Sequence, residues 1–187
     1  MKINTTTLAK NFIKENVSNG DIVIDATMGR GNDTLFLSQL VGKDGFVYAF
    51  DIQQEAIDDT KTKLIQNNSY NNVSLILDGH ENMDKYIKDN NVSCVVFNFG
   101  YLPKANHNIC TKPDSSILAI QKSLQILKKK GVISLCVYQG GDTGFEEKEA
   151  IFNFLKDLDY NKYTVIVSEF FNRPNYPPIH IKIIKEI

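Results

Sequence analysis

The chain has 187 residues, which suits one domain with a substantial core, and we predict a single domain over residues 1–187. Hydrophobic residues make up 42% of the chain and charged residues 23%, a balance that argues against disorder and against membrane-spanning segments. The formal net charge of −1 means that any contact with nucleic acid must be local. Because the first residues, Met1–Thr7, lack the apolar core of a signal peptide, we expect a cytoplasmic protein without membrane contact.

Helices and strands are predicted to alternate along the chain. In order, we expect a leading helix carrying Leu8, Phe12 and Ile13, a strand at 23–25, a helix at 33–40, a strand at 46–51, a helix at 54–67, a strand at 73–77, a short helix at 83–87, a strand at 94–99, a helix at 115–127, a strand at 132–137, a helix at 146–158 and strands at 163–171 and 179–184. The triple lysine 128–130 should complement the C-terminus of the preceding helix.

This alternation predicts an α/β, Rossmann-like fold. Seven strands form a mostly parallel sheet covered on both faces, and the last two, joined by the Pro-rich turn 172–178, form an antiparallel hairpin at its edge. Such a layout is typical of a class I methyltransferase. Since no long linker is present, a substrate must be recognised by loops at the carboxyl ends of the strands or by a partner subunit.

The cysteines do not form a metal-binding or disulfide pattern. Cys94, Cys110 and Cys136 are widely spaced and include no Cys-x-x-Cys, so we expect no metal site. Cys94 and Cys136 lie in apolar runs and are interpreted as buried thiols, whereas Cys110 belongs to a polar loop.

The first strand ends in Asp25 and leads into a turn that contains Gly29 and Gly31. Glycines after a buried strand are typical of a nucleotide-cofactor loop. Thr34 occupies the place of the third glycine of a dinucleotide fingerprint, and the carboxylate of Asp25 would repel a pyrophosphate. S-adenosylmethionine fits better than a dinucleotide, because it carries a sulfonium and an ammonium and no phosphate.

Two further acids stand at strand ends. Asp51 follows the glycines by about 20 residues, where a carboxylate can accept both ribose hydroxyls. The third strand ends in Asp78-Gly79-His80, which is placed to border an adenine ring. The alternative is that each acid only caps the turn or helix that follows it.

A second motif, Asn98-Phe99-Gly100-Tyr101-Leu102-Pro103, closes the fourth strand. Its Asn-x-x-Tyr spacing is similar to the Asn-Pro-Pro-Tyr signature of amino-methyltransferases, in which the amide holds the amine and the ring stacks on its base. Asn98 is therefore predicted to orient the acceptor and Tyr101 to stack on it, since methyl transfer to nitrogen depends mainly on positioning and desolvation. His107 in the next loop is a candidate for assisting deprotonation, and the alternative is a solvated bystander.

These motifs resemble, over nearly the whole chain, the small class I methyltransferases of the YtqB/MnmM type, a family labelled "putative rRNA methylase". The matching segments are 25–34, 50–53, 78–82, 97–103 and 172–178. The resemblance implies S-adenosylmethionine as cofactor and methylation of the amine of 5-aminomethyl-(2-thio)uridine at the tRNA wobble position. It implies cofactor contacts from Asp25, Thr27, Gly29, Gly31, Asp33, Thr34, Asp51, Gln53, Asp78, Gly79 and His80.

The chain departs from this family at three places. Arg30 replaces the asparagine usual between the two glycines, and Lys104-Ala105-Asn106-His107 replaces a Gly-rich, acidic loop. After the fifth strand, Gly141 stands where relatives tend to have histidine, so the identity of a base stays open.

The leading hypothesis is a tRNA-modifying methyltransferase that contacts the anticodon region through Lys104 and Lys112. Alternatives are an rRNA or small-molecule N-methyltransferase, an NAD-type oxidoreductase, and an RNA-binding module with a relict cofactor pocket. A homodimer is compatible with the sequence.

Overall fold

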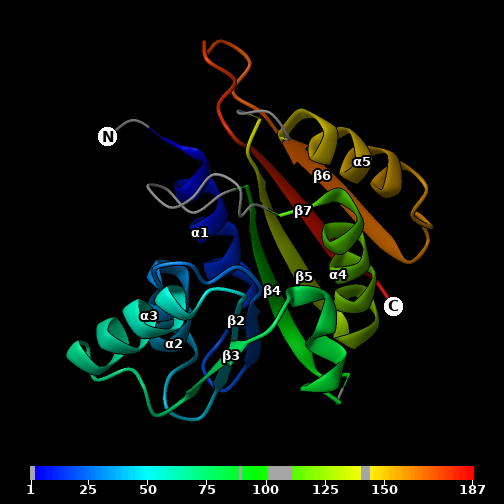
Figure 1. Cartoon of the computed structure of the whole chain (residues 1–187). Coiled ribbons are helices and arrows are strands. Elements are labelled where there is room, and N and C mark those ends of the chain that lie inside the picture. Colours follow the sequence, from blue (N-terminus) through cyan, green and yellow to red (C-terminus); the bar gives the residue numbers. More distant parts are fainter. Residues whose placement is uncertain (1–2, 89, 101–110, 140–143) are drawn as a thin grey trace.

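A computed structural model describes residues 3–88, 90–100, 111–139 and 144–187 (Figure 1). The elements are, in chain order, α1 (Thr5–Asn16), β1 (Ile22–Asp25), α2 (Asn32–Val41), β2 (Phe46–Asp51), α3 (Gln54–Gln66), β3 (Val73–Leu77), the 3-10 helix η1 (His80–Lys85), β4 (Val92–Phe99), α4 (Pro113–Ile126), β5 (Leu127–Val137), α5 (Gly144–Lys156), β6 (Tyr163–Ser168) and β7 (Ile179–Lys185).

One seven-stranded sheet runs through the molecule, in the order β3-β2-β1-β4-β5-β7-β6. Strands β1 to β5 are mutually parallel, β7 pairs antiparallel with β5, and β6 pairs antiparallel with β7. The predicted parallel sheet with an antiparallel hairpin at its edge is confirmed. Within that hairpin, β7 pairs with β5 and β6 forms the outer edge. Because parallel strands share a direction, the carboxyl ends of β1, β2, β3, β4 and β5 meet at one edge.

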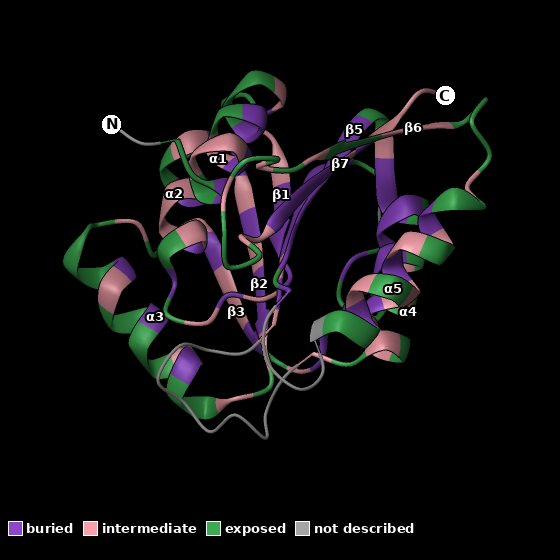
Figure 2. Ribbon diagram, turned by 90° about the horizontal axis from the view of Figure 1, so that it is seen from above, coloured by how far each residue is buried: buried purple, intermediate pink, exposed green. Residues whose placement is uncertain are grey.

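Two helical layers sandwich the sheet. Figure 2 shows α1, α2 and α3 on one face and α4 and α5 on the other, with the buried strands between them. Each layer has its own apolar core. Leu37 and Val47 belong to the core under α1–α3, and Phe97 and Ile133 to the core under α4 and α5. Strand β4 is buried along almost all of its length because it lies between both layers.

Three predicted boundaries differ from the structure by three residues or more, and the others agree within two residues. The short helix begins at His80 instead of residue 83, β6 ends at Ser168 instead of 171, and β5 begins at Leu127 instead of 132. The early start of β5 coincides with a register shift opposite the start of β4 and with a positive φ of 63° at Lys130. A β-bulge of this kind is not marked by apolar alternation, which explains why the sequence pattern missed it.

The prediction for the triple lysine 128–130 is wrong. Lys128 pairs with Asp21 at 2.7 Å and Lys130 pairs with Glu186, so these lysines belong to β5 and bind acids of neighbouring segments. Lys185 of β7 complements the C-terminus of α4 instead, donating to the carbonyl oxygen of Leu124 in the last turn at 3.1 Å and to that of the C-cap residue Leu127 at 2.8 Å.

The interpretation of two cysteines as buried thiols is confirmed. Cys94 and Cys136 are free and buried, and burial raises the pKa of both thiols, that of Cys136 to about 12. Cys110 lies outside the described residues. Among the helices described, none is both long and apolar enough to cross a membrane.

Candidate active site

The glycine loop is a tight turn after β1, at the carboxyl edge of the sheet. The amide of Gly31 donates to the carbonyl of Met28 at 2.8 Å, and Gly31 has a left-handed φ of 70°. A Cβ at this position would lie 2.7 Å from the side chain of Thr60 in α3. Thr60 also donates its hydroxyl to the carbonyl of Gly29 at 3.0 Å. Only glycine therefore fits at position 31, for both conformational and steric reasons.

The carboxylate of Asp51 holds the loop from the end of β2. One oxygen accepts from the amide of Gly29 and the other from the amide of Gln53, each at 3.0 Å. Burial raises the pKa of Asp51, and these amide hydrogen bonds oppose the rise. Because a carboxylate oxygen has more than one lone pair, both oxygens can still accept a ligand hydroxyl.

Ile52, which the sequence interpretation did not single out, is 61% exposed next to Asp51. An exposed apolar side chain beside a carboxylate suits a nucleoside, since the ring can lie on the apolar group while the ribose binds the acid. The signal in the sequence was an aliphatic residue placed directly after the acid that ends the strand.

Asp25 and Thr34 lie beneath the loop and contact each other. Both are fully buried, and Asp25 accepts from the Thr34 hydroxyl at 2.7 Å and from the amide of Thr27 at 3.3 Å. Burial, together with the negative charge of Asp33, raises the pKa of Asp25 to about 7. These two side chains join the end of β1 to the first turn of α2, and their role in cofactor binding stays a prediction.

Asp78 organises the turn after β3. It accepts from the Gly79 amide and the Asn82 side chain, each at 2.8 Å, and from the Tyr86 hydroxyl at 2.9 Å. Partial burial alone would raise the pKa of Asp78, but these hydrogen bonds hold it below its usual value. The geometry matches the alternative interpretation of Asp78 as a turn cap, which leaves a cofactor contact by this residue a prediction.

His80 points into the protein. Its Nδ1 lies 3.2 Å from the carbonyl oxygen of Ala26, and its ring stands edge-on to Phe97 and Phe99, with centroids 5.8 and 6.0 Å away. Burial lowers the pKa of His80, so the imidazole is neutral at pH 7. This position suits a wall beneath the glycine loop better than a base.

Asn98 is brought directly to the predicted cofactor residues. Its side-chain nitrogen donates to the Asp33 carboxylate at 2.9 Å, and its backbone amide donates to the Thr27 hydroxyl at 2.8 Å. Asp33 lies in the first turn of α2, and Lys10 approaches its second oxygen at 3.9 Å. Because Asp33 holds the amide nitrogen, the amide oxygen of Asn98 is the atom that can accept a hydrogen bond from an acceptor amine.

The segment that carries Tyr101, Lys104 and His107 lies outside the described residues, but its two flanks are in contact. Gly100 and Thr111 exchange hydrogen bonds: the Gly100 amide donates to the Thr111 hydroxyl at 3.0 Å, and the Thr111 amide donates to the Gly100 carbonyl at 3.1 Å. The buried carboxylate of Glu147 accepts from the Thr111 hydroxyl at 2.8 Å. Both strand β4 and helix α5 therefore fix the flanks of this segment.

Tyr138 adds an aromatic ring that the sequence interpretation did not use. It follows β5 directly, is 42% exposed, and its ring would lie about 3.5 Å from a Cβ at Gly100. Position 138 thus lies beside the end of β4 that carries Asn98. Burial raises the pKa of the Tyr138 phenol, so the ring is neutral at pH 7.

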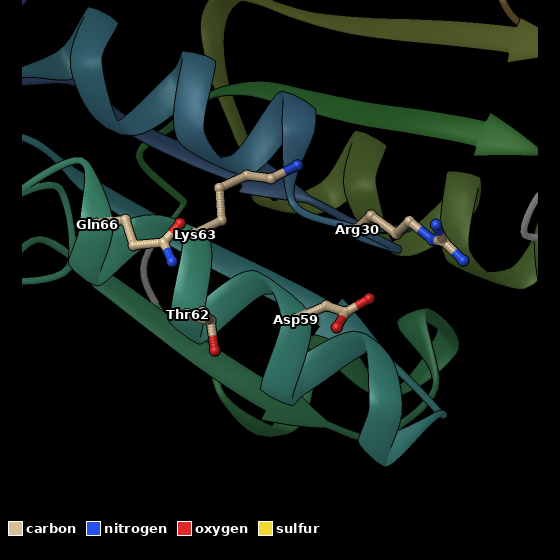
Figure 3. Close-up of a pocket in the computed structure, with 5 residues that line it drawn as sticks. All are labelled: Arg30, Asp59, Thr62, Lys63 and Gln66. Atoms are coloured by element: carbon tan, nitrogen blue, oxygen red, sulfur yellow. The ribbon is translucent and has the colours of Figure 1, made fainter.

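A polar cavity of about 270 Å³ lies on the outer side of the glycine loop, against α3. Figure 3 shows Arg30 and Asp59 at one end of this cavity and Lys63 and Gln66 at the other. None of its lining residues is a predicted cofactor residue. Among the parts of the chain that the structure describes, no three His, Cys, Asp or Glu side chains stand together as a metal site.

Comparisons with known proteins identify relatives over the whole chain. The family described as "Putative rRNA methylase" matches residues 47–184. A structure titled "putative rRNA-methylase" from Clostridium thermocellum is 47% identical, covers 99% of both chains and superimposes with a TM-score of 0.96. A methyltransferase structure from Streptococcus mutans, SMU.1697c, in complex with SAH, is 40% identical, covers 99% of both chains and has a TM-score of 0.89.

A curated relative from Arabidopsis thaliana is named "tRNA (mnm(5)s(2)U34)-methyltransferase, chloroplastic". It is 38% identical over an alignment of 170 residues that covers 86% of this chain. The aligned region spans 62% of that relative's length.

Proposed function

The chain belongs to the family described as "Putative rRNA methylase", and we propose that it methylates the amine of 5-aminomethyl-(2-thio)uridine at the wobble position of tRNA. It is an S-adenosylmethionine-dependent methyltransferase, as the fold and the SAH-bound relative show. The observation that carries the proposal is the hydrogen bond between Asn98 and Asp33, which fixes an amide oxygen beside the glycine loop. The name of the Arabidopsis relative supports the choice of substrate.

The residues at the carboxyl edge fit S-adenosylmethionine. The turn at Gly31 leaves no room for a side chain, Asp51 offers a carboxylate for the ribose, and Ile52 offers apolar surface for the adenine. When bound, S-adenosylmethionine supplies an electrophilic methyl group on a positively charged sulfur. We propose that Asp51 and Ile52 hold the nucleoside end, with Gln53 at its margin, and that the amino-acid end lies near Asp25 and Gly29, with Thr27 beside it.

The acceptor amine is oriented by Asn98 in this proposal. The amide oxygen of Asn98 accepts one N–H of the amine, so that the nitrogen lone pair faces the methyl group. Methyl transfer forms one C–N bond and breaks one C–S bond, and the nitrogen that becomes positively charged then loses a proton. Asp33, bonded to Asn98 and near Lys10, holds the Asn98 amide so that its oxygen is available to this nitrogen.

Neither histidine among the described residues is proposed to accept the proton that the methylated amine loses. His80 is buried against the carbonyl of Ala26 and His180 is buried against Ser134, and the second ring nitrogen of each is buried as well, so neither imidazole is open to a substrate amine. His107, outside the described residues, stays a candidate, and water is the alternative. Since a dry site lowers the pKa of an aliphatic amine, the neutral form is available without a strong base.

Binding of the tRNA anticodon region is proposed to involve Tyr101 as a stacking platform for the pyrimidine, with Lys104 and Lys112 nearby. Lys112 is exposed at the N-terminus of α4, while Tyr101 and Lys104 lie outside the described residues. A cytoplasmic location and a homodimer also stay predictions.

The experiment is a comparison of tRNA nucleosides from cells with and without the gene, by mass spectrometry. The proposal predicts that the methylaminomethyl nucleoside is lost and that its aminomethyl precursor accumulates. Wild-type levels of the methylated nucleoside in the deletion strain would contradict the proposal.

The description of the family favours one second candidate, methylation of rRNA. The same strains distinguish the two, because an rRNA methyltransferase would change the nucleosides of ribosomal RNA and leave those of tRNA intact.

A further inference from the structure

The loop between β6 and β7, residues 169–178, presents aromatic side chains to solvent. Phe171 is fully exposed and Tyr176 is 70% exposed. Phe145, at the start of α5, is 51% exposed and meets Tyr176 edge-on with ring centroids 5.9 Å apart. Rings of this size are seldom left in water without a partner, because their burial is favourable.

The topology places this loop at the edge of the sheet that carries the candidate active site. Strand β7 is antiparallel to β5, so Ile179 pairs with Val137 at the carboxyl end of β5. The side chain of Gln139 donates to the carbonyl of Pro177 at 2.9 Å, and Thr5 donates to the carbonyl of Pro178 at 2.7 Å. Figure 1 shows the loop, in orange and red, projecting beyond this edge. These hydrogen bonds therefore anchor the end of the loop next to β7, while its aromatic residues project into solvent.

We propose that the 169–178 loop, with Phe145, binds unpaired bases of the RNA substrate by stacking. The inference rests on the proposed function insofar as the substrate is RNA. It adds a binding surface for the nucleotides that neighbour the methylated base, away from Asn98.

The chemistry of the loop favours RNA over a second copy of the chain. The loop is not apolar throughout, because Asn172, Arg173 and Asn175 stand among its rings in the sequence. The Arg173 guanidinium lies 3.8 Å from the centroid of the Phe170 ring, which leaves a fixed positive charge among the aromatics. Exposed rings interspersed with polar residues and an arginine match the π-faces and phosphates of a single strand, whereas the core of a protein interface is depleted of charged residues.

The test compares Phe171→Ala and Tyr176→Ala with a matched control, Tyr160→Ala. Tyr160 is 84% exposed but precedes β6, at the opposite edge of the sheet. We expect each loop variant to raise the KM for tRNA and the Kd for a synthetic anticodon stem-loop RNA by about 5- to 100-fold, the range of a lost base stack. Affinity for S-adenosylmethionine and kcat at saturating tRNA should stay unchanged, and the control should match the wild type.

Three outcomes would overturn the inference. Loop variants with wild-type KM and stem-loop affinity would show that the rings do not contact RNA, even if tRNA methylation by the wild type stands. If the loop variants convert a dimer into monomers in sedimentation experiments without changing stem-loop affinity, the rings bind a second copy instead. If the wild type methylates a small molecule and binds no stem-loop, the proposed function and the inference both fail.

Discussion

The hydrogen bond between Asp33 and Asn98 gives the sharpest prediction about methyl transfer. Replacing Asp33 by Ala removes a carboxylate that accepts from the Asn98 side chain at 2.9 Å. A hydrogen bond to a charged group contributes about 1.5–3 kcal/mol. If this free energy serves only to orient the amide in the transition state, the methyl-transfer rate should fall about 10- to 100-fold.

The assay is single-turnover methylation of tRNA that carries the aminomethyl group, alongside calorimetric titration of S-adenosylmethionine. Asn98→Ala should lower the rate and keep the cofactor affinity. The double variant that combines Asp33→Ala with Asn98→Ala should methylate no more slowly than Asn98→Ala alone, because the two residues act through one interaction. Asp33→Asn, which keeps an acceptor oxygen but loses the charge, should lie between Asp33→Ala and the wild type.

Lys10 provides the control. It approaches Asp33 at 3.9 Å and its side chain is 35% exposed, so Lys10→Ala should change the rate by less than about 5-fold. A wild-type rate in Asp33→Ala would refute the positioning role. An equal loss of cofactor affinity would instead assign Asp33 to cofactor binding, which is the role that the family resemblance implies.

The remaining predictions concern the loop and its support. Asp51→Ala should weaken S-adenosylmethionine binding by about 2–3 kcal/mol in calorimetry, and unchanged affinity would remove Asp51 from the site. Gly31→Ala should lower the melting temperature and cofactor affinity more than Gly20→Ala, because both glycines have positive φ but only Gly31 faces a side chain at 2.7 Å. For Asp25, the folded-state pKa of about 7 lies above the usual 3.8. The contribution of protonated Asp25 to the free energy of unfolding is therefore present at low pH and is lost as pH rises toward 7. Asp25→Asn should therefore gain about 2 kcal/mol of unfolding free energy relative to the wild type between pH 5 and pH 8 in urea titrations, and a constant difference would contradict the raised pKa.

The fold could be predicted from the sequence because its signals are local. Apolar runs such as 94–99 and the glycine turn at 29–31 identify buried parallel strands and a cofactor loop without any knowledge of contacts. The triple lysine could not be placed in the same way. Its partners Asp21 and Glu186 are distant in sequence, and the lysine that complements α4 comes from β7.

The sequence predicts which residues form the candidate site but not which of them contact one another. Asp25 and Asp51 both end strands, yet Asp25 is buried under the loop while Asp51 accepts from the Gly29 amide and keeps lone pairs for a ligand. Thr60 has no motif of its own, and its role depends on α3 packing against the loop. Only the three-dimensional structure pairs Asn98 with Asp33, 65 residues earlier in the chain.

We propose that this protein methylates the amine of a wobble uridine in tRNA, and purified components test this directly. The most direct measurement incubates the purified protein with S-adenosylmethionine and tRNA that carries the aminomethyl group, followed by nucleoside mass spectrometry. We expect that the aminomethyl nucleoside gains one methyl group and that Asn98→Ala, with its cofactor affinity intact, suppresses the gain. An unchanged tRNA nucleoside, together with methylation of ribosomal RNA by the same preparation, would contradict it.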